Sequence, residues 1–157
     1  PKAEVIQKAE KNNIPVKIFA EADWQNVEAI IAYLRSYRTQ YIILAGYLQL
    51  LPSVFIQAFP HRILNIHPAL LPKYGGKGMY GKYVHEKVFE NKETETGITV
   101  HELNEKYDEG KIIFQKTVSV EENDSSESIE KKVRKLELKY FPEIVEEFIL
   151  QKNKLIF

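Results

Sequence analysis

The 157-residue chain contains no cysteine. Without thiols it can form no disulfide, use no cysteine nucleophile and bind no zinc ion or iron–sulfur cluster through sulfur. The absence of cysteine is compatible with a cytoplasmic location, which we expect for this protein.

Net charge and long hydrophobic runs are also absent. The 22 basic side chains balance the 22 acidic ones, whereas general nucleic-acid binders usually carry a basic excess. No apolar run approaches the roughly 20 residues that are needed to span a bilayer. We therefore expect neither a nucleic-acid nor a membrane partner.

Glycine is scarce, and four of the 7 glycines lie between positions 75 and 81. Glycine is used where the backbone adopts a positive φ or approaches another group closely, so this segment is a candidate loop beside a site. The chain has no G-x-G-x-x-G fingerprint and no P-loop. A nucleotide-binding module built on either motif is therefore disfavoured.

Two hydrophobic periods alternate along the chain. Helical spacing of apolar residues predicts helices at residues 2–12, 27–34, 52–59, 82–91 and 124–148. Apolar runs predict strands at residues 16–19, 41–45, 62–67, 97–101 and 111–120. Asp23 is expected to cap the second helix. This alternation predicts one α/β domain over residues 1–157, with a mostly parallel twisted sheet, helices on both faces and antiparallel end strands.

Asn65 and His67 are the first candidate site residues. They stand two apart on a predicted strand, so their side chains face the same side, and ligands of α/β folds bind at the carboxyl ends of strands. A hydrogen-bonded pair that only supports the following loop is about as probable from the spacing alone. In the functional interpretation, the two side chains donate hydrogen bonds to a developing oxyanion, and the histidine can also move a proton.

Asp108 is the third candidate, in the sequence Tyr107-Asp108-Glu109-Gly110. Aspartate and glycine are favoured in turns, and that simple interpretation is the better one for this segment by itself. The functional alternative is a carboxylate that orients His67 or takes a proton from the attacking group. No serine or cysteine nucleophile accompanies the three residues, which favours direct transfer without a covalent enzyme intermediate.

The remaining histidines are interpreted as structural residues. His101 lies on a predicted strand, where a hydrogen-bonded core histidine is more common than a ligand. His61 and His85 are expected at the surface or on a helix. No two histidines have the spacing of a familiar metal site, so we expect no metal.

Four sequence blocks in a fixed order make the interpretation specific. They are Leu44–Leu48 (L-A-G-Y-L), Asn65–Tyr74 (N-I-H-P-A-L-L-P-K-Y), Gly97–His101 (G-I-T-V-H) and Tyr107–Gln115 (Y-D-E-G-K-I-I-F-Q). In order and spacing the blocks resemble those of the phosphoribosylglycinamide formyltransferase family. The resemblance covers essentially the whole chain.

The resemblance implies a reaction in purine biosynthesis. A formyl group passes from 10-formyltetrahydrofolate, the co-substrate, to the amino group of glycinamide ribonucleotide. Asn65, His67 and Asp108 match the catalytic residues of the family. The first two would stabilise a tetrahedral oxyanion, and Asp108 would tune His67 and help to relay a proton.

The resemblance also implies the binding residues. Those matched to the folate site are Leu48, Gln49, Leu50, Leu51, Glu105, Lys106, Tyr107 and Asp108. Arg134 and Glu137 match positions near the phosphate end of the nucleotide, and Thr99 matches a position beside the catalytic residues. Gln49 stands where the family usually has arginine.

The amino-terminal region departs from the family pattern. The family begins with a strand and a G-S-G-S/T-N loop that binds the substrate phosphate, and nothing similar precedes Pro1. We therefore expect a formyltransferase domain that is incomplete at its N-terminus.

Two related enzymes and one non-enzyme remain as alternatives. Methionyl-tRNA formyltransferase usually has an arginine after the L-L-P block, where this chain has Lys73-Tyr74-Gly75. A 10-formyltetrahydrofolate hydrolase usually has a regulatory region ahead of this domain. The chain could also be an inactive folate-binding fragment, which would bind folate without turnover.

Overall fold

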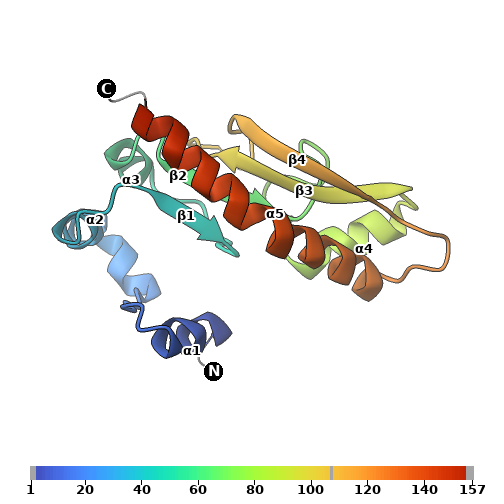
Figure 1. Ribbon diagram of the computed structural model, residues 1–157, viewed down its shortest axis with the longest axis horizontal. Helices are drawn as coiled ribbons and strands as arrows, with labels where there is room; N and C mark the ends of the chain where they lie inside the picture. The colour runs from blue at the N-terminus through green and yellow to red at the C-terminus, as the bar shows by residue number, and fades with distance from the viewer. Residues whose placement is uncertain (1–2, 107, 155–157) are drawn as a thin grey trace.

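The computed structural model of the chain describes residues 3–106 and 108–154. Four strands form one sheet in the order β1-β2-β3-β4 (Figure 1). They are β1 (Ile42–Ala45), β2 (Ile63–His67), β3 (Glu95–Glu102) and β4 (Ile112–Ser119). β1 and β2 are parallel, whereas β2–β3 and β3–β4 are antiparallel. The α/β class and the antiparallel end strands are confirmed, and parallel pairing within the described residues is confined to β1 and β2.

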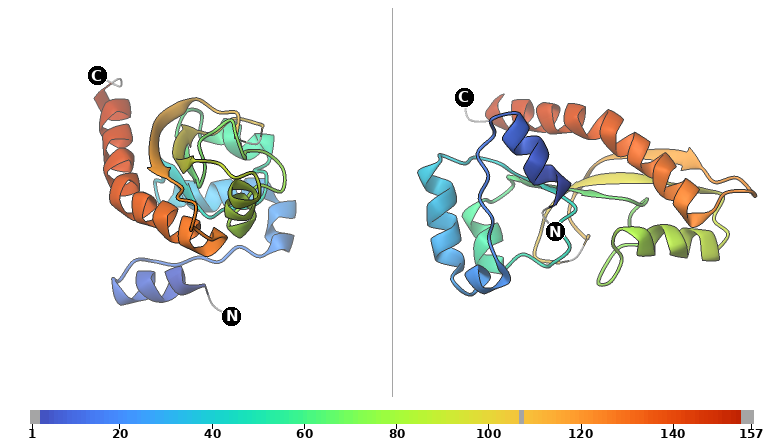
Figure 2. Two further views of the ribbon diagram at one scale, coloured as in Figure 1. Left: turned by 90° about the vertical axis from the view of Figure 1, so that its right-hand side faces the viewer. Right: turned by 90° about the horizontal axis from the view of Figure 1, so that it is seen from below.

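Helices lie on both sides of this sheet. They are α1 (Glu4–Lys11), the short 3-10 helix η1 (Glu21–Gln25), α2 (Val27–Ser36), α3 (Ser53–Ala58), α4 (Lys82–Glu90) and α5 (Ser126–Lys154). The long helix α5 crosses one face of the sheet, and α1 stands apart from the sheet in Figure 1 and in the left view of Figure 2. Among the described residues, no helix is both long and apolar enough to cross a membrane.

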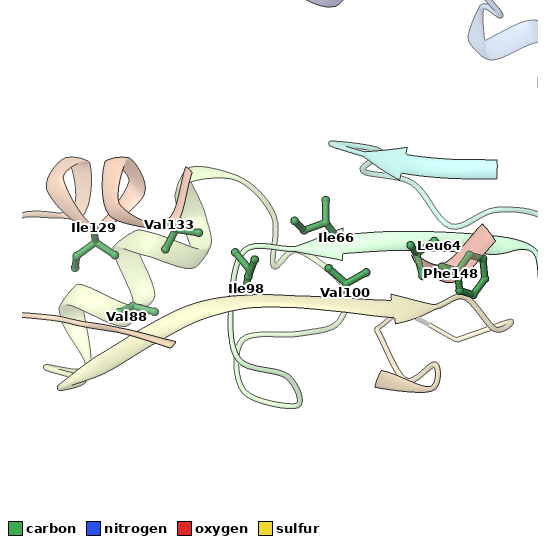
Figure 3. Close-up of a cluster of buried hydrophobic side chains, with 8 residues drawn as sticks. All are labelled: Leu64, Ile66, Val88, Ile98, Val100, Ile129, Val133 and Phe148. Atoms are coloured by element: carbon green, nitrogen blue, oxygen red, sulfur yellow. The ribbon is translucent and has the colours of Figure 1, made fainter. Parts of the chain in front are cut away.

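Strand β2 serves two hydrophobic clusters because its successive side chains point to opposite faces. Leu64 and Ile66 pack with residues of α5, α4 and β3, whereas Ile63 packs with residues of α2 and α3. The cluster on the α5 side, drawn in Figure 3, comprises Leu64, Ile66, Val88, Ile98, Val100, Ile129, Val133 and Phe148. The alternation leaves Asn65 and His67 on the same face as Ile63.

Two expectations for the amino-terminal part are wrong. Residues 14–20 form no strand; β1 is at the sheet edge and pairs only with β2 among the described residues, so Val16 and Ile18 lack a strand beside them and stay exposed. Asp23 lies within η1, where its carboxylate accepts a hydrogen bond from the Ala20 amide. The side chain that caps α2 is Asn26.

Candidate active site

The carboxyl end of β2 carries the first two candidate residues. Asn65 lies opposite His101 and His67 lies opposite Thr99 in the antiparallel pairing with β3. The Asn65 amide Nδ2 donates a hydrogen bond to Nε2 of His101, at 3.0 Å. An amide NH₂ group has two hydrogens to donate. One of them therefore remains available to a ligand.

One ring nitrogen of His67 makes a hydrogen bond, and the other faces a carboxylate. Its Nε2 donates to the main-chain carbonyl of Tyr74 at 2.7 Å, and its Nδ1 lies 3.6 Å from Oδ1 of Asp108. Burial lowers the pKa of His67 below its ordinary value, although the Asp108 carboxylate and the Tyr74 carbonyl act in the opposite direction. The ring is therefore neutral near pH 7, with a carboxylate placed to stabilise a proton when one arrives.

Asp108 completes the cluster from the loop between β3 and β4. Its Oδ2 accepts a hydrogen bond from the Gly76 amide at 2.8 Å, and its Oδ1 lies 3.6 Å from Nε2 of His101 as well as from His67. Burial alone would raise the pKa of Asp108. The imidazoles of His101 and His67 and the Gly76 N–H outweigh it, so the pKa is lowered and the group is a carboxylate at neutral pH.

A threonine on β3 fixes the loop that follows β2. The Thr99 hydroxyl donates to the carbonyl of Ala69 at 2.6 Å and accepts from the amide of Leu71 at 3.0 Å. The Gln115 side chain donates to the same hydroxyl at 2.8 Å and to the Leu71 carbonyl at 3.0 Å. Because Thr99 is fully buried, these bonds hold the loop without competition from water.

The next segment brings two main-chain groups to the candidate side chains His67 and Asp108. Tyr74, at φ +57°, supplies the carbonyl that binds His67. Its hydroxyl donates to Glu93 and accepts from Asn91, each at 2.8 Å. A Cβ on Gly75 would lie 2.6 Å from a Leu71 methyl and 3.2 Å from Cβ of Asp108. Glycine at this position therefore permits the close approach of the segment to Asp108.

A cleft of about 820 Å³ opens above these residues. It is bounded by the loop after β1, by the glycine-rich segment that precedes α4, and by one side of α5. The predicted site residues that line it are Leu48, Gln49, Leu50, Leu51, Asn65, His67, Lys106, Asp108, Arg134 and Glu137. Glu105 is not among the lining residues and instead accepts a hydrogen bond from Gln57. Tyr107 lies outside the described residues.

The cleft has an apolar part at the loop after β1 and charged residues on α5. Leu48 and Leu50, from the loop after β1, remain 54% and 43% exposed. Arg134 and Glu137 line the cleft from α5, beside apolar residues of the same helix. Burial raises the pKa of Glu137, a nearby carboxylate of Glu130 adds to this, and the Arg134 guanidinium opposes it.

Some lining residues were not predicted from the sequence. His85 was expected as a surface or helix residue; it is on α4 but only 4% exposed, and it lines the cleft together with Glu130 and Phe141. His101 was expected as a satisfied core histidine, yet its Nδ1 has no hydrogen-bond partner within the described part of the chain. In that same part, no group of three or more His, Asp and Glu residues is arranged to hold a metal ion.

Comparison with known proteins gives the lineage of this site. The family model described as "Formyl transferase" matches residues 1–145. The chain belongs to the formyl transferase family. It is 45% identical, over 142 residues, to the chloroplastic phosphoribosylglycinamide formyltransferase of Arabidopsis thaliana, covering 87% of this chain and 49% of the relative. It is 36% identical, over 158 residues, to the phosphoribosylglycinamide formyltransferase of Bacillus subtilis, covering 98% of this chain and 78% of the relative.

Solved structures agree with the fold. The phosphoribosylglycinamide formyltransferase from Bacillus halodurans superposes on this chain with a TM-score of 0.85 at 29% identity, covering 95% of this chain and 76% of the other. The expected resemblance is confirmed. The chain spans about half the length of the Arabidopsis relative and about three quarters of the Bacillus subtilis one.

Proposed function

We propose that this formyltransferase moves a formyl group from 10-formyltetrahydrofolate to the amino group of glycinamide ribonucleotide, a step of purine biosynthesis. The observation that carries the proposal is the grouping of Asn65, His67 and Asp108 near the end of β2, inside a cleft lined by both apolar and charged side chains. The names of the relatives support the choice of substrates.

In the proposed reaction, the amine attacks the formyl carbon and the carbonyl oxygen becomes an oxyanion. The free N–H of Asn65 donates to this oxygen, because its other N–H is already used on His101. Removing one such donor typically lowers kcat by roughly 100- to 1000-fold. The bond to the formyl group's original nitrogen then breaks, and that nitrogen takes up the proton that the attacking amine releases.

His67 and Asp108 would handle that proton. A neutral imidazole can accept a proton, and a carboxylate at 3.6 Å stabilises the imidazolium that results. Nε2 of His67 is engaged by the Tyr74 carbonyl, so Nδ1 is the nitrogen that gains and loses the proton. Asp108 is fixed by the Gly76 amide, which keeps the carboxylate in place during the step.

The apolar part of the cleft suits the folate. Leu48 and Leu50 present large apolar side chains to open space, which is typical of a surface that binds a flat aromatic ligand. Gln49 and Lys106 line the same cleft and supply hydrogen-bond donors at its edge. We infer that these residues and Leu51 contact the co-substrate.

The charged side chains of the cleft suit the ribonucleotide. Arg134 and Lys77 line the cleft and provide positive charge for a phosphate. Glu137, also on α5, provides a group that hydrogen-bonds hydroxyls. A single domain over residues 1–157 and a cytoplasmic location remain predictions.

The test is acceptor-dependent turnover. The full chain is mixed with a 10-formyl folate whose deformylation changes its absorbance, with and without glycinamide ribonucleotide. The proposal predicts that the folate is deformylated only when the ribonucleotide is present. It also predicts that mass spectrometry finds formylated ribonucleotide in an amount equimolar to the folate consumed. Deformylation without acceptor would indicate the hydrolase alternative, and saturable folate binding with no turnover would indicate the inactive fragment.

A further inference from the structure

His85 is a buried histidine whose ring makes no internal hydrogen bond. The residue is 4% exposed, and its Nδ1 is buried without a partner. Of the three buried histidines among the described residues, His67 bonds the Tyr74 carbonyl and His101 bonds Asn65. Leaving a buried polar group unpaired costs roughly 1–3 kcal/mol. An apolar side chain at this position would therefore stabilise the fold at least as well as the imidazole does.

The ring has one nitrogen that reaches the cleft. His85 lines the cleft from α4. Its Nε2 bonds no described residue and, unlike Nδ1, is not fully buried. Nε2 is therefore the ring atom accessible to a ligand. A buried acceptor without a partner is tolerated better than a buried N–H without one. The neutral ring accordingly carries its proton on Nε2, as a donor.

The surroundings of His85 indicate what kind of atom it would meet. Glu130 of α5 and His67 are both close enough to act electrostatically on the ring. Burial lowers the pKa of His85, which keeps the ring neutral near pH 7 even with Glu130 nearby. The Glu130 carboxylate is unfavourable to an anion directly beside this ring, so the phosphate is left to the positive charges of Arg134 and Lys77. A hydroxyl group fits, because it can accept from an imidazole N–H and donate to a carboxylate.

We propose that His85 is a substrate-contacting residue whose Nε2 donates a hydrogen bond to a sugar hydroxyl of the acceptor, with the Glu130 carboxylate facing the same part of the cleft. This inference rests on the proposed function, since it assigns a role in binding the ribonucleotide. The folate site proposed above is built by the loop after β1, whereas His85 lines the same cleft from α4, so the inference assigns His85 to the acceptor.

The test compares three variants with the wild-type chain. His85→Leu removes the donor and the unpaired nitrogen with little change in volume. His85→Gln replaces the imidazole with an amide that can donate from a similar position. The matched control is His61→Leu, the same change at a histidine whose side chain is 79% exposed and which does not line the cleft. Steady-state KM for each substrate, calorimetric Kd for glycinamide ribonucleotide and the melting temperature are measured for all.

The proposal predicts a separation of binding from stability. His85→Leu should raise the ribonucleotide KM and Kd about 5- to 10-fold, the value of one hydrogen bond, and leave the folate KM within about twofold. Its melting temperature should equal or exceed that of the wild type, because an unpaired buried nitrogen is gone. His85→Gln should recover most of the ribonucleotide affinity, and His61→Leu should bind both substrates normally.

Two results would overturn the proposal. One is a ribonucleotide Kd for His85→Leu within twofold of the wild type. The other is a lower melting temperature with both substrate affinities weakened together, which would make His85 a structural residue. The proposed function is judged separately, by turnover of the wild type. Turnover together with an unchanged His85→Leu overturns only the role of His85, whereas ribonucleotide binding that depends on His85 without turnover overturns only the reaction.

Discussion

Asp108→Asn is the substitution that separates catalysis from binding most cleanly. Asparagine has the same shape and still offers an oxygen to the Gly76 amide, which now binds Oδ2 at 2.8 Å. It also tolerates the positive φ of +52° at this position better than other residues do. What the variant loses is the negative charge beside the two imidazoles.

The size of the effect follows from the distance between the charges. Two unit charges 3.6 Å apart, as Oδ1 of Asp108 and Nδ1 of His67 are, interact by about 4–5 kcal/mol at an effective dielectric constant of about 20. The amide dipole retains a small part of this. Losing roughly 3–4 kcal/mol of stabilisation when His67 carries the proton lowers kcat by about 10²- to 10³-fold.

The assay measures kcat and the calorimetric Kd for a non-reactive 10-formyl folate analogue on both proteins. The folate Kd should stay within about threefold, because the leucines at the apolar part of the cleft are unchanged. Asp124→Asn is the matched control, since Asp124 pairs with Lys132 and does not line the cleft. A kcat within tenfold of the wild type, at an unchanged melting temperature, would refute the proposed role of Asp108.

Three further predictions follow from the same structure. Activity should fall as the pH drops through the lowered pKa of His67, because the neutral ring is the proton acceptor. In Asp108→Asn this fall should begin at a lower pH, because the Asp108 carboxylate raises the pKa of His67. A pH–rate profile of the variant in which the fall does not shift would contradict the pairing. Thr99→Val should lower the free energy of unfolding by roughly 1–3 kcal/mol for each buried partner left unpaired. It should also lower kcat, because the loop after β2 loses these bonds. An unchanged free energy of unfolding in urea denaturation would contradict this. The pKa of Asp124 is lowered to about 2, chiefly by Lys132, so its contribution to stability is full above about pH 4 and is lost as the pH falls towards 2; melting curves of Asp124→Asn should therefore differ from the wild type at pH 6 and converge with it in acid.

The grouping of the candidate residues could be predicted from the sequence in part, because two local rules place Asn65 and His67. The two-residue period of a strand puts Asn65 and His67 on one face, and the end of a strand is where α/β folds bind ligands. Asp108 needed the family resemblance, because an aspartate before a glycine is also an ordinary turn. The structure brings the three together through the pairing of β2 with β3.

The parts that the sequence could not predict depend on contacts between distant elements. Residues 16–19 have the composition of a strand, yet a strand forms only beside another strand. His85 neighbours Val84 on α4, and only the packing of α4 against α5 decides whether the ring is covered. The side-chain oxygen that caps α2 belongs to Asn26. Asp23 cannot take this place because it lies within η1, where its carboxylate binds the Ala20 amide.

The most direct test of the account follows a labelled formyl carbon. The full chain is incubated with 10-[¹³C]formyltetrahydrofolate and glycinamide ribonucleotide, and the products are identified by mass spectrometry and by ¹³C NMR. The account predicts that the label appears in an amide on the ribonucleotide, one per folate consumed, and that Asp108→Asn slows this transfer by about 10²- to 10³-fold. Label recovered as free formate, or remaining on the folate while both ligands bind, would contradict it.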